Sequence, residues 1–218
     1  MERIPEPELM VDPAQARAYA TADFSEPHDA FIGHFRRLFP EFAGGRVLDL
    51  GCGAADVTIR FARAYPGASV DGIDGSEAML KLGREALRQA RLQSRVTLRL
   101  LRIPSADLGG GYDAVISNSL LHHLSEPATL WNAITRAARP GAPVLIMDLL
   151  RPDSRETATK LVSLHAAEAP PLLVRDFMNS LLAAYRPDEI ARQLHAGGVD
   201  RLAIGVVSDR HWLVWGHV

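Results

Sequence analysis

The segment 47–56, VLDLGCGAAD, joins an apolar run to a turn that contains two glycines and is flanked by two acids. Gly51 and Gly53 lack a Cβ, so the backbone can turn tightly and a ligand can approach the main chain closely. The helix expected next offers free N–H groups and the positive end of its dipole. Asp49 and Asp56 flank this turn, and carboxylates there suit a cationic ligand better than a pyrophosphate.

The turn differs from the dinucleotide-binding fingerprint, because Asp56 stands where that pattern has a third glycine or an alanine. A further acid, Asp74, closes the segment VDGIDGS. An acid at the end of a second strand can accept hydrogen bonds from both hydroxyls of a ribose, each worth about 1.5–3 kcal/mol. The alternatives are a purely structural turn and a capping role for Asp74. The favoured ligand therefore carries a ribose and a positive charge.

The elements that must position these residues alternate along the chain. Short, branched segments predict strands at 46–50, 68–74, 95–101, 112–118 and 142–150. Helical periodicity predicts helices at 12–24, 27–40, 56–65, 76–90 and 127–138, with Ser76 as an N-cap. Strict alternation predicts a parallel sheet covered on both faces. In such a sheet, ligands bind at the carboxyl ends of the strands, where the glycine turn lies.

The pattern changes after residue 150. Residues 152–184 have helical character interrupted by Pro170 and Pro171, and a further helix is expected at 188–195. Two closing strands, 201–207 and 211–216, are separated by a short link typical of an antiparallel pair. The period of two places Trp212 and Trp215 on opposite faces of the last strand.

S-adenosylmethionine has the ribose and the positive charge, and four segments resemble the class I S-adenosylmethionine-dependent methyltransferases, in their small-molecule branch. The segments are VLDLGCGAAD, VDGIDGSEAML, GYDAVISNSLLHHL and ARPGAPVLIMD, and the resemblance covers about residues 45–150. It implies an α/β fold with a Rossmann-like, doubly wound, seven-stranded sheet that is mostly parallel, with an antiparallel last strand. We expect a single domain, 1–218, with an N-terminal helical arm at 1–40 and a helical lid insertion at 152–184.

The resemblance also implies residues for the cofactor. Asp49, Gly51 and Gly53 are expected beside its methionine half, with Cys52 as a small wall residue, and Asp74 is expected at the ribose. The remaining expected contacts are Gly75 and Ser76 beside the adenine, Asn118 at the methionine part, and Tyr19 as an aromatic that closes over the cofactor. Relatives usually carry an acid after the third strand, whereas this chain has Leu101 and Arg102, whose main-chain groups are left to contact adenine.

The acceptor should lie near the ends of the fourth and fifth strands. His122, His123 and Asp148 are the candidates for catalysis. The alternative is packing or helix-start hydrogen bonding for the two histidines and a local ion pair for Asp148. The candidates for binding the acceptor are Arg151, Arg175, Asn179, Arg210 and His211. For these the alternatives are local ion pairs and solvent-facing positions. No metal is expected, because Asp148 has no convincing partners in the sequence.

Composition narrows the function classes. The chain has 218 residues, 47% hydrophobic and 23% charged, with a formal net charge of −2, so no overall field favours nucleic acid or an acidic membrane. Cys52 is the only cysteine, which excludes a disulfide within the chain. The N-terminal MERIPEPELM lacks the apolar core of a signal peptide, and no apolar run approaches about 20 residues. We therefore expect a cytoplasmic protein; the oligomeric state stays open.

The favoured function is methyl transfer from S-adenosylmethionine to a small-molecule acceptor by in-line displacement. Such a site mainly aligns the nucleophile with the S–CH₃ bond and excludes water. One alternative is a protein that binds the cofactor without transferring its methyl group, as a regulatory or partner subunit. Another is a methyltransferase fold used for chemistry other than methylation.

Overall fold

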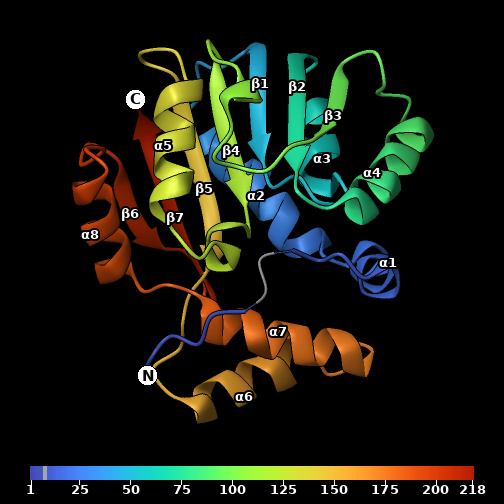
Figure 1. Ribbon diagram of the computed structural model, residues 1–218, viewed down its shortest axis with the longest axis vertical. Coiled ribbons are helices and arrows are strands. Elements are labelled where there is room, and N and C mark those ends of the chain that lie inside the picture. Colours follow the sequence, from blue (N-terminus) through green and yellow to red (C-terminus); the bar gives the residue numbers. More distant parts are fainter. Residues whose placement is uncertain (7–8) are drawn as a thin grey trace.

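The computed structural model describes residues 1–6 and 9–218 (Figure 1). The described residues form a seven-stranded sheet in the order β3-β2-β1-β4-β5-β7-β6. The strands are β1 (Gly44–Leu50), β2 (Gly67–Asp74), β3 (Val96–Leu100), β4 (Ala114–Asn118), β5 (Pro143–Leu149), β6 (Ala203–Val206) and β7 (His211–His217). β1 to β5 are parallel, whereas β7 runs antiparallel to both β5 and β6. This confirms the predicted doubly wound sheet with an antiparallel last strand.

Helices α1, α4 and α6 each begin at a residue whose side chain caps them. Asp12 accepts a hydrogen bond from the N–H of Gln15 at the start of α1, and Ser76 accepts one from the N–H of Met79 at the start of α4, as predicted. The helices are α1 (Pro13–Thr21), α2 (Ser25–Leu38), α3 (Asp56–Ala64), α4 (Glu77–Ala90), α5 (Ala128–Ala137), α6 (Arg155–His165), α7 (Pro171–Ala183) and α8 (Pro187–Ala196). Two short 3₁₀ turns, η1 (Ala106–Leu108) and η2 (Leu121–His123), follow β3 and β4.

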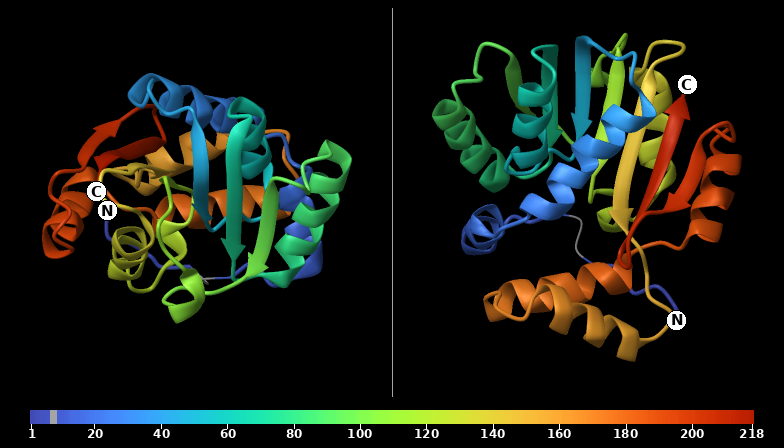
Figure 2. Two further views of the ribbon diagram at one scale, coloured as in Figure 1. Left: turned by 90° about the horizontal axis from the view of Figure 1, so that it is seen from above. Right: turned by 180° about the vertical axis from the view of Figure 1, so that it is seen from behind.

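Helices cover both faces of the sheet (Figure 2), and each face buries a core of its own. On one face, α2, α3 and α4 pack an aromatic cluster in which Phe35 contacts Phe61 at a centroid distance of 4.9 Å. On the other face, α5 and α8 cover a core that includes Trp131. Trp212 belongs to this second core, whereas Trp215 packs against the first, so the predicted opposite facing of the two tryptophans is confirmed.

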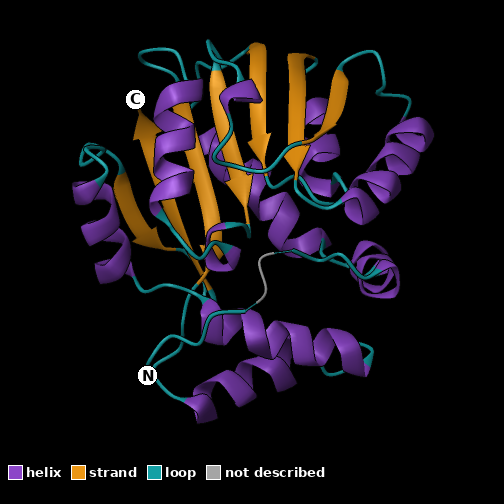
Figure 3. Cartoon of the chain, in the orientation of Figure 1, coloured by secondary structure: helices purple, strands orange, loops and turns teal. Residues whose placement is uncertain are grey.

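A third layer lies beyond the carboxyl ends of the parallel strands (Figures 1 and 3). It consists of α6 and α7, separated near Pro170 as expected, which pack a small apolar cluster of their own together with Leu149. Residues 1–6 and 9–12, the described part of the N-terminal segment before α1 and called the arm below, join this layer. The N–H of Ile4 donates to the carbonyl of Leu182 at 3.0 Å. None of the helices in the described part of the chain has the length and apolar character needed to cross a bilayer.

Candidate active site

The glycine turn between β1 and α3 is held against the end of β2. The N–H groups of Gly51 and Cys52 donate to the carbonyl of Ile73 at 2.9 and 3.0 Å. Gly51 has φ +72° and Gly53 has φ +53°, a left-handed backbone that glycine adopts without steric cost. A Cβ at Gly51 would also lie 2.8 Å from the side chain of Leu120. Cys52 is buried beside Gly72, consistent with a small wall position.

Asp74 fixes the far side of this turn. Its carboxylate accepts the N–H of Gly53 at 2.9 Å and the N–H of Ser76 at 2.7 Å. Burial raises the pKa of Asp74, and the backbone hydrogen bonds act against that rise. A carboxylate can accept about four hydrogen bonds, so two main-chain donors leave acceptor capacity for the hydroxyls of a ribose.

The two acids that flank the turn have different surroundings. Asp49 is buried and accepts the hydroxyl of Thr58 at 2.6 Å, and burial raises its pKa to about 7. Asp56 instead contacts Nδ1 of His28 on α2 at 2.6 Å and the guanidinium of Arg60 at 3.1 Å. The carboxylate of Asp56 is therefore engaged by side chains of α2 and α3, and Asp49, at the end of β1, is the buried acid beside the turn.

Asn118 ends β4 with a buried side-chain oxygen that has no hydrogen-bond partner in the described structure. An unpaired buried acceptor costs about 1–3 kcal/mol, so this atom fits a ligand that donates a hydrogen bond. Tyr19, on α1, stacks on Phe24 at a centroid distance of 4.7 Å. Burial, followed by the charges of Asp56, Asp148 and Asp74, raises its pKa to about 12. Its hydroxyl thus lies in the field of acids at the start of α3 and at the ends of β5 and β2.

The arm forms the outer wall of the expected adenine region. Oγ of Ser76 donates to the carbonyl of Met10 at 2.5 Å. A Cβ at Gly75 would lie 2.7 Å from Leu9 and 3.1 Å from the side chain of Arg102. Leu101 is partly buried, and its N–H donates to the carbonyl of Asp74 at 3.0 Å, so this main chain adjoins the end of β2. These contacts bring the residues predicted for adenine together at the end of β2.

The residues predicted for catalysis meet at the ends of β4 and β5. Nδ1 of His122 contacts Oδ1 of Asp148 at 2.5 Å, and the N–H of His122 donates to the other oxygen of Asp148 at 3.2 Å. Both side chains are buried. Although burial opposes protonation of His122, the charge and hydrogen bond of Asp148 hold its pKa above the usual value. The same pairing keeps the pKa of Asp148 low against the opposing effect of burial.

Glu6 on the arm completes this cluster. Its Oε1 lies 3.4 Å from Nε2 of His122 and 3.3 Å from Nδ1 of His123, and it accepts the hydroxyl of Ser180 on α7 at 2.9 Å. Burial raises the pKa of Glu6, while the charge of His122 acts in the opposite direction. Sequence reasoning missed Glu6. It stands between two prolines in an irregular segment, where no periodicity or motif distinguishes one acid from another.

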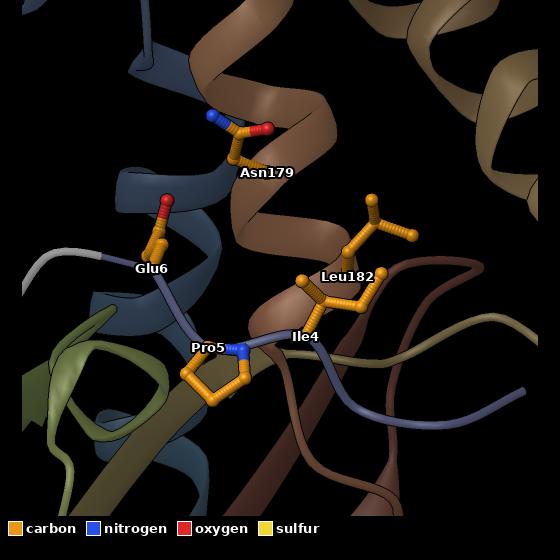
Figure 4. Close-up of a pocket in the computed structure, with 5 residues that line it drawn as sticks. All are labelled: Ile4, Pro5, Glu6, Asn179 and Leu182. Atoms are coloured by element: carbon orange, nitrogen blue, oxygen red, sulfur yellow. The ribbon is translucent and has the colours of Figure 1, made fainter.

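A pocket of about 150 Å³ separates the arm from α7, lined by Ile4, Pro5, Glu6, Asn179 and Leu182. Figure 4 shows Glu6 projecting from the arm and Asn179 from α7 at this pocket. Arg175 is exposed and pairs with Asp176, whose other oxygen accepts the side chain of Gln15 on α1 at 2.8 Å. Of the residues predicted on this helix, Asn179 therefore borders the cluster, and the exposed Arg175 pairs locally.

Arg151 is buried and joins three elements. Its guanidinium donates to the carbonyl of Ala184 at 2.9 Å and to Glu189 on α8 at 2.7 Å. These contacts link the end of β5 to the end of α7 and to α8. The pairing with Glu189 is the local ion pair that the sequence offered as the alternative to acceptor binding.

Arg210 and His211 border a second pocket, of about 140 Å³, between α2 and the start of β7. Arg210 pairs with Glu26 and with Asp209, both at 3.1 Å. His211 is buried and contacts Oγ of Ser208 at 3.0 Å through Nδ1. Burial, with a smaller effect from Arg210, lowers the pKa of His211 to about 4. This pocket and the Glu6 pocket are lined by different residues, so the structure divides the predicted acceptor residues between two places.

The site fits S-adenosylmethionine by the chemistry of its donors. A bare glycine turn, a free acceptor on Asn118, and carboxylates at Asp49 and Asp74 suit a nucleoside that carries a sulfonium and an ammonium group. These residues come from the ends of β1, β2 and β4, where ligands of doubly wound sheets bind.

Comparison with known proteins agrees with this assignment. A family model described as "Methyltransferase domain" matches residues 48–144. The ubiquinone biosynthesis O-methyltransferase of Methylococcus capsulatus is 29% identical over 170 residues, which are 76% of this chain and 68% of that protein.

Solved structures share the fold. An S-adenosylmethionine-dependent methyltransferase from Aquifex aeolicus superimposes with a TM-score of 0.66 at 19% identity, covering 94% of this chain and 97% of that one. A plantazolicin methyltransferase in complex with S-adenosylhomocysteine has a TM-score of 0.62 at 13% identity, covering 92% and 84%. The motif order, the sheet topology and the matched domain together support a class I S-adenosylmethionine-dependent methyltransferase.

Proposed function

We propose that this enzyme transfers the methyl group of S-adenosylmethionine to a hydroxyl oxygen of a small-molecule acceptor. The curated relative from Methylococcus capsulatus is named an O-methyltransferase, which supports oxygen as the methylated atom. The net charge of −2 gives no overall attraction to the phosphates of a nucleic acid, so we propose a small acceptor rather than a polynucleotide.

The observation that carries this proposal is the buried contact between His122 and Asp148 at the carboxyl edge of β4 and β5. Because Nδ1 is committed to Asp148, Nε2 is the ring atom that remains to activate an acceptor hydroxyl. Asp148 positions the imidazole, as the carboxylate does in other histidine pairs. Nε2 lies 3.4 Å from Oε1 of Glu6, which lines the pocket between the arm and α7, so we place the acceptor at this pocket, beside Asn179.

The cofactor would lie along the glycine turn, with its ribose at Asp74, its methionine part at Asn118 and Asp49, and its adenine near Gly75 and Leu101. When bound, it supplies a methyl group already activated by a positive sulfur. The chain aligns the acceptor oxygen with the S–CH₃ bond and excludes water from the line of attack. We further propose that 152–184 acts as the cover of this site within a single domain, with Tyr19 closing the opposite side.

The test is methyl transfer by the purified enzyme from labelled S-adenosylmethionine to a panel of hydroxylated aromatic and aliphatic acceptors, followed by mass spectrometry. We expect a mass gain of one methyl group on an oxygen. His122→Gln should lower turnover by about 10²–10⁴-fold, the contribution typical of groups that activate a nucleophile, with cofactor affinity retained. His195→Gln, at an exposed pair on α8, is the matched control. Methylation on nitrogen or carbon, or full turnover by His122→Gln, would contradict the proposal.

A further inference from the structure

Glu6, His122 and His123 form a cluster of three metal-ligating side chains at the end of β4. One ligand atom from each lies within 4.8 Å of the other two. Oε1 of Glu6 is 3.4 Å from Nε2 of His122 and 3.3 Å from Nδ1 of His123. Both separations exceed the usual length of a hydrogen bond. Ligands bound tetrahedrally at 2.0–2.1 Å are about 3.4 Å apart, so the two distances suit an ion held between these atoms.

The groups behind the cluster match those found around metal ligands. Asp148 holds Nδ1 of His122 at 2.5 Å, which directs Nε2 toward Glu6. A histidine that binds a metal almost always contacts a carboxylate, a carbonyl or water through its other nitrogen. Glu6 is positioned in turn by the hydroxyl of Ser180. A guanidinium nitrogen of Arg3 donates to the carbonyl of His122 at 2.9 Å, which holds the arm against η2.

The cluster is shielded from water. The side chains of His122, Glu6 and His123 are 3%, 11% and 26% exposed. A carboxylate with little solvent access is stabilised by an opposite charge, and a divalent cation between Glu6 and the two imidazoles supplies one. The nearest arginine on the arm, Arg3, directs its guanidinium to carbonyls of His122 and Ala183 instead.

We propose that Glu6, His122 and His123 bind one zinc-type divalent cation that also contacts the acceptor oxygen. Two imidazole nitrogens and one carboxylate oxygen suit Zn²⁺, whereas Mg²⁺ and Ca²⁺ prefer sites made of oxygens. Catalytic zinc sites have three protein ligands and keep one position open. The sequence alone led us to expect no metal, and the proposed site departs from that expectation.

With the cation bound, Nε2 of His122 is a ligand, and the cation rather than the imidazole would activate the acceptor hydroxyl that the proposed function places at this cluster; in that respect the inference rests on the proposed function. A hydroxyl bound to Zn²⁺ loses its proton near neutral pH, and the proton passes to solvent. The oxygen then forms its bond to the methyl carbon while the S–CH₃ bond breaks and sulfur keeps the electron pair. Because Glu6 belongs to the arm, binding of the cation would also hold the arm over the site.

Zinc binding is measured on the full chain without cofactor or acceptor. The protein is dialysed against a chelator and titrated with Zn²⁺ by calorimetry, and Co²⁺ is added in parallel to read the intense visible absorption of a tetrahedral site. We expect one Zn²⁺ per chain and no comparable binding of Mg²⁺. Glu6→Gln and His123→Gln should each weaken binding by at least about 10–100-fold, the loss that removal of a group supporting a metal ligand already causes. Circular dichroism verifies that each variant is folded.

Glu2→Gln and His195→Gln are the matched controls, because Glu2 is an exposed acid of the same arm and His195 is an exposed histidine paired with Asp200. Both should bind Zn²⁺ as the parent chain does. No stoichiometric Zn²⁺ binding, or equal binding by Glu6→Gln and His123→Gln, would overturn the metal site. Full methyl transfer in the presence of a chelator would likewise overturn it while leaving the proposed O-methylation intact. Zinc binding without any methylated acceptor would support the metal site and contradict the proposed O-methylation.

Discussion

Asp49 accepts the hydroxyl of Thr58 at 2.6 Å, which ties the end of β1 to the first turn of α3 beneath the glycine turn. Burial raises the pKa of Asp49 to about 7, and the hydrogen bond from Thr58 limits that rise. The group that lies within the proposed cofactor site therefore changes its charge near neutral pH.

The affinity for S-adenosylmethionine should depend on pH through Asp49. A cation bound nearby favours the carboxylate, so binding near pH 7 releases a proton and strengthens as the pH rises from 6 to 8. Calorimetry in two buffers with different ionisation enthalpies measures the released proton. Asp49→Asn should remove both the proton release and the slope. Thr58→Val should move the midpoint to higher pH, because it deletes the hydrogen bond that favours the carboxylate. Affinity that stays constant over this range in the parent chain would exclude Asp49 from the site.

Asn118 offers a prediction in which stability and binding change in opposite directions. Its Oδ1 is buried without a partner, and Asn118→Leu replaces the amide with an apolar group of similar size. We expect the free energy of unfolding of the ligand-free chain to rise by about 1 kcal/mol, because an unpaired polar atom is removed. The affinity for S-adenosylmethionine should fall about tenfold, which corresponds to 1.4 kcal/mol. Thermal unfolding and calorimetry measure the two effects, and unchanged affinity would show that Oδ1 binds no part of the cofactor.

Asp74 holds both the turn and, in our proposal, the ribose. Asp74→Ala removes the acceptor for the N–H groups of Gly53 and Ser76, so it should lower the free energy of unfolding by about 1–3 kcal/mol. It should also weaken cofactor binding by at least about tenfold, since it removes the ribose acceptor. Asp74→Asn keeps one acceptor oxygen and is the matched variant, expected to retain more of the stability than of the affinity. If Asp74→Ala lost stability alone, the ribose would be held elsewhere.

The sheet and its helices could be predicted from the sequence because local signals agree with the tertiary packing. Alternating strands and helices, the cap at Ser76 and the glycine turn each specify their own conformation, and the observed elements lie along the chain where these signals predict them. His122 and Asp148 could be placed together for the same reason, since parallel strands end at one edge.

The contacts made across long sequence distances could not be predicted. Glu6 reaches the histidines only because the arm lies along α7, and no local pattern encodes that packing. The partners in the ion pairs could not be predicted either. The sequence does not show that Arg151 pairs with Glu189, or that Asp56 contacts His28 and Arg60. These outcomes depend on which partner lies nearest after folding.

His211 should make the fold sensitive to acid. Burial and the neighbouring Arg210 lower its pKa from 6.5 to about 4 in the folded chain, so the unfolded chain binds a proton more readily. The contribution of His211 to the free energy of unfolding is complete above pH 6.5 and is lost as the pH falls toward 4, by up to about 3 kcal/mol. Denaturant unfolding from pH 7.5 to pH 4 measures the slope. His211→Asn cannot gain this proton and should flatten the slope, whereas His195→Asn, at an exposed position, should leave it unchanged. Equal slopes for the parent chain and His211→Asn would mean that the pocket between α2 and β7 admits water and tolerates the charged imidazole.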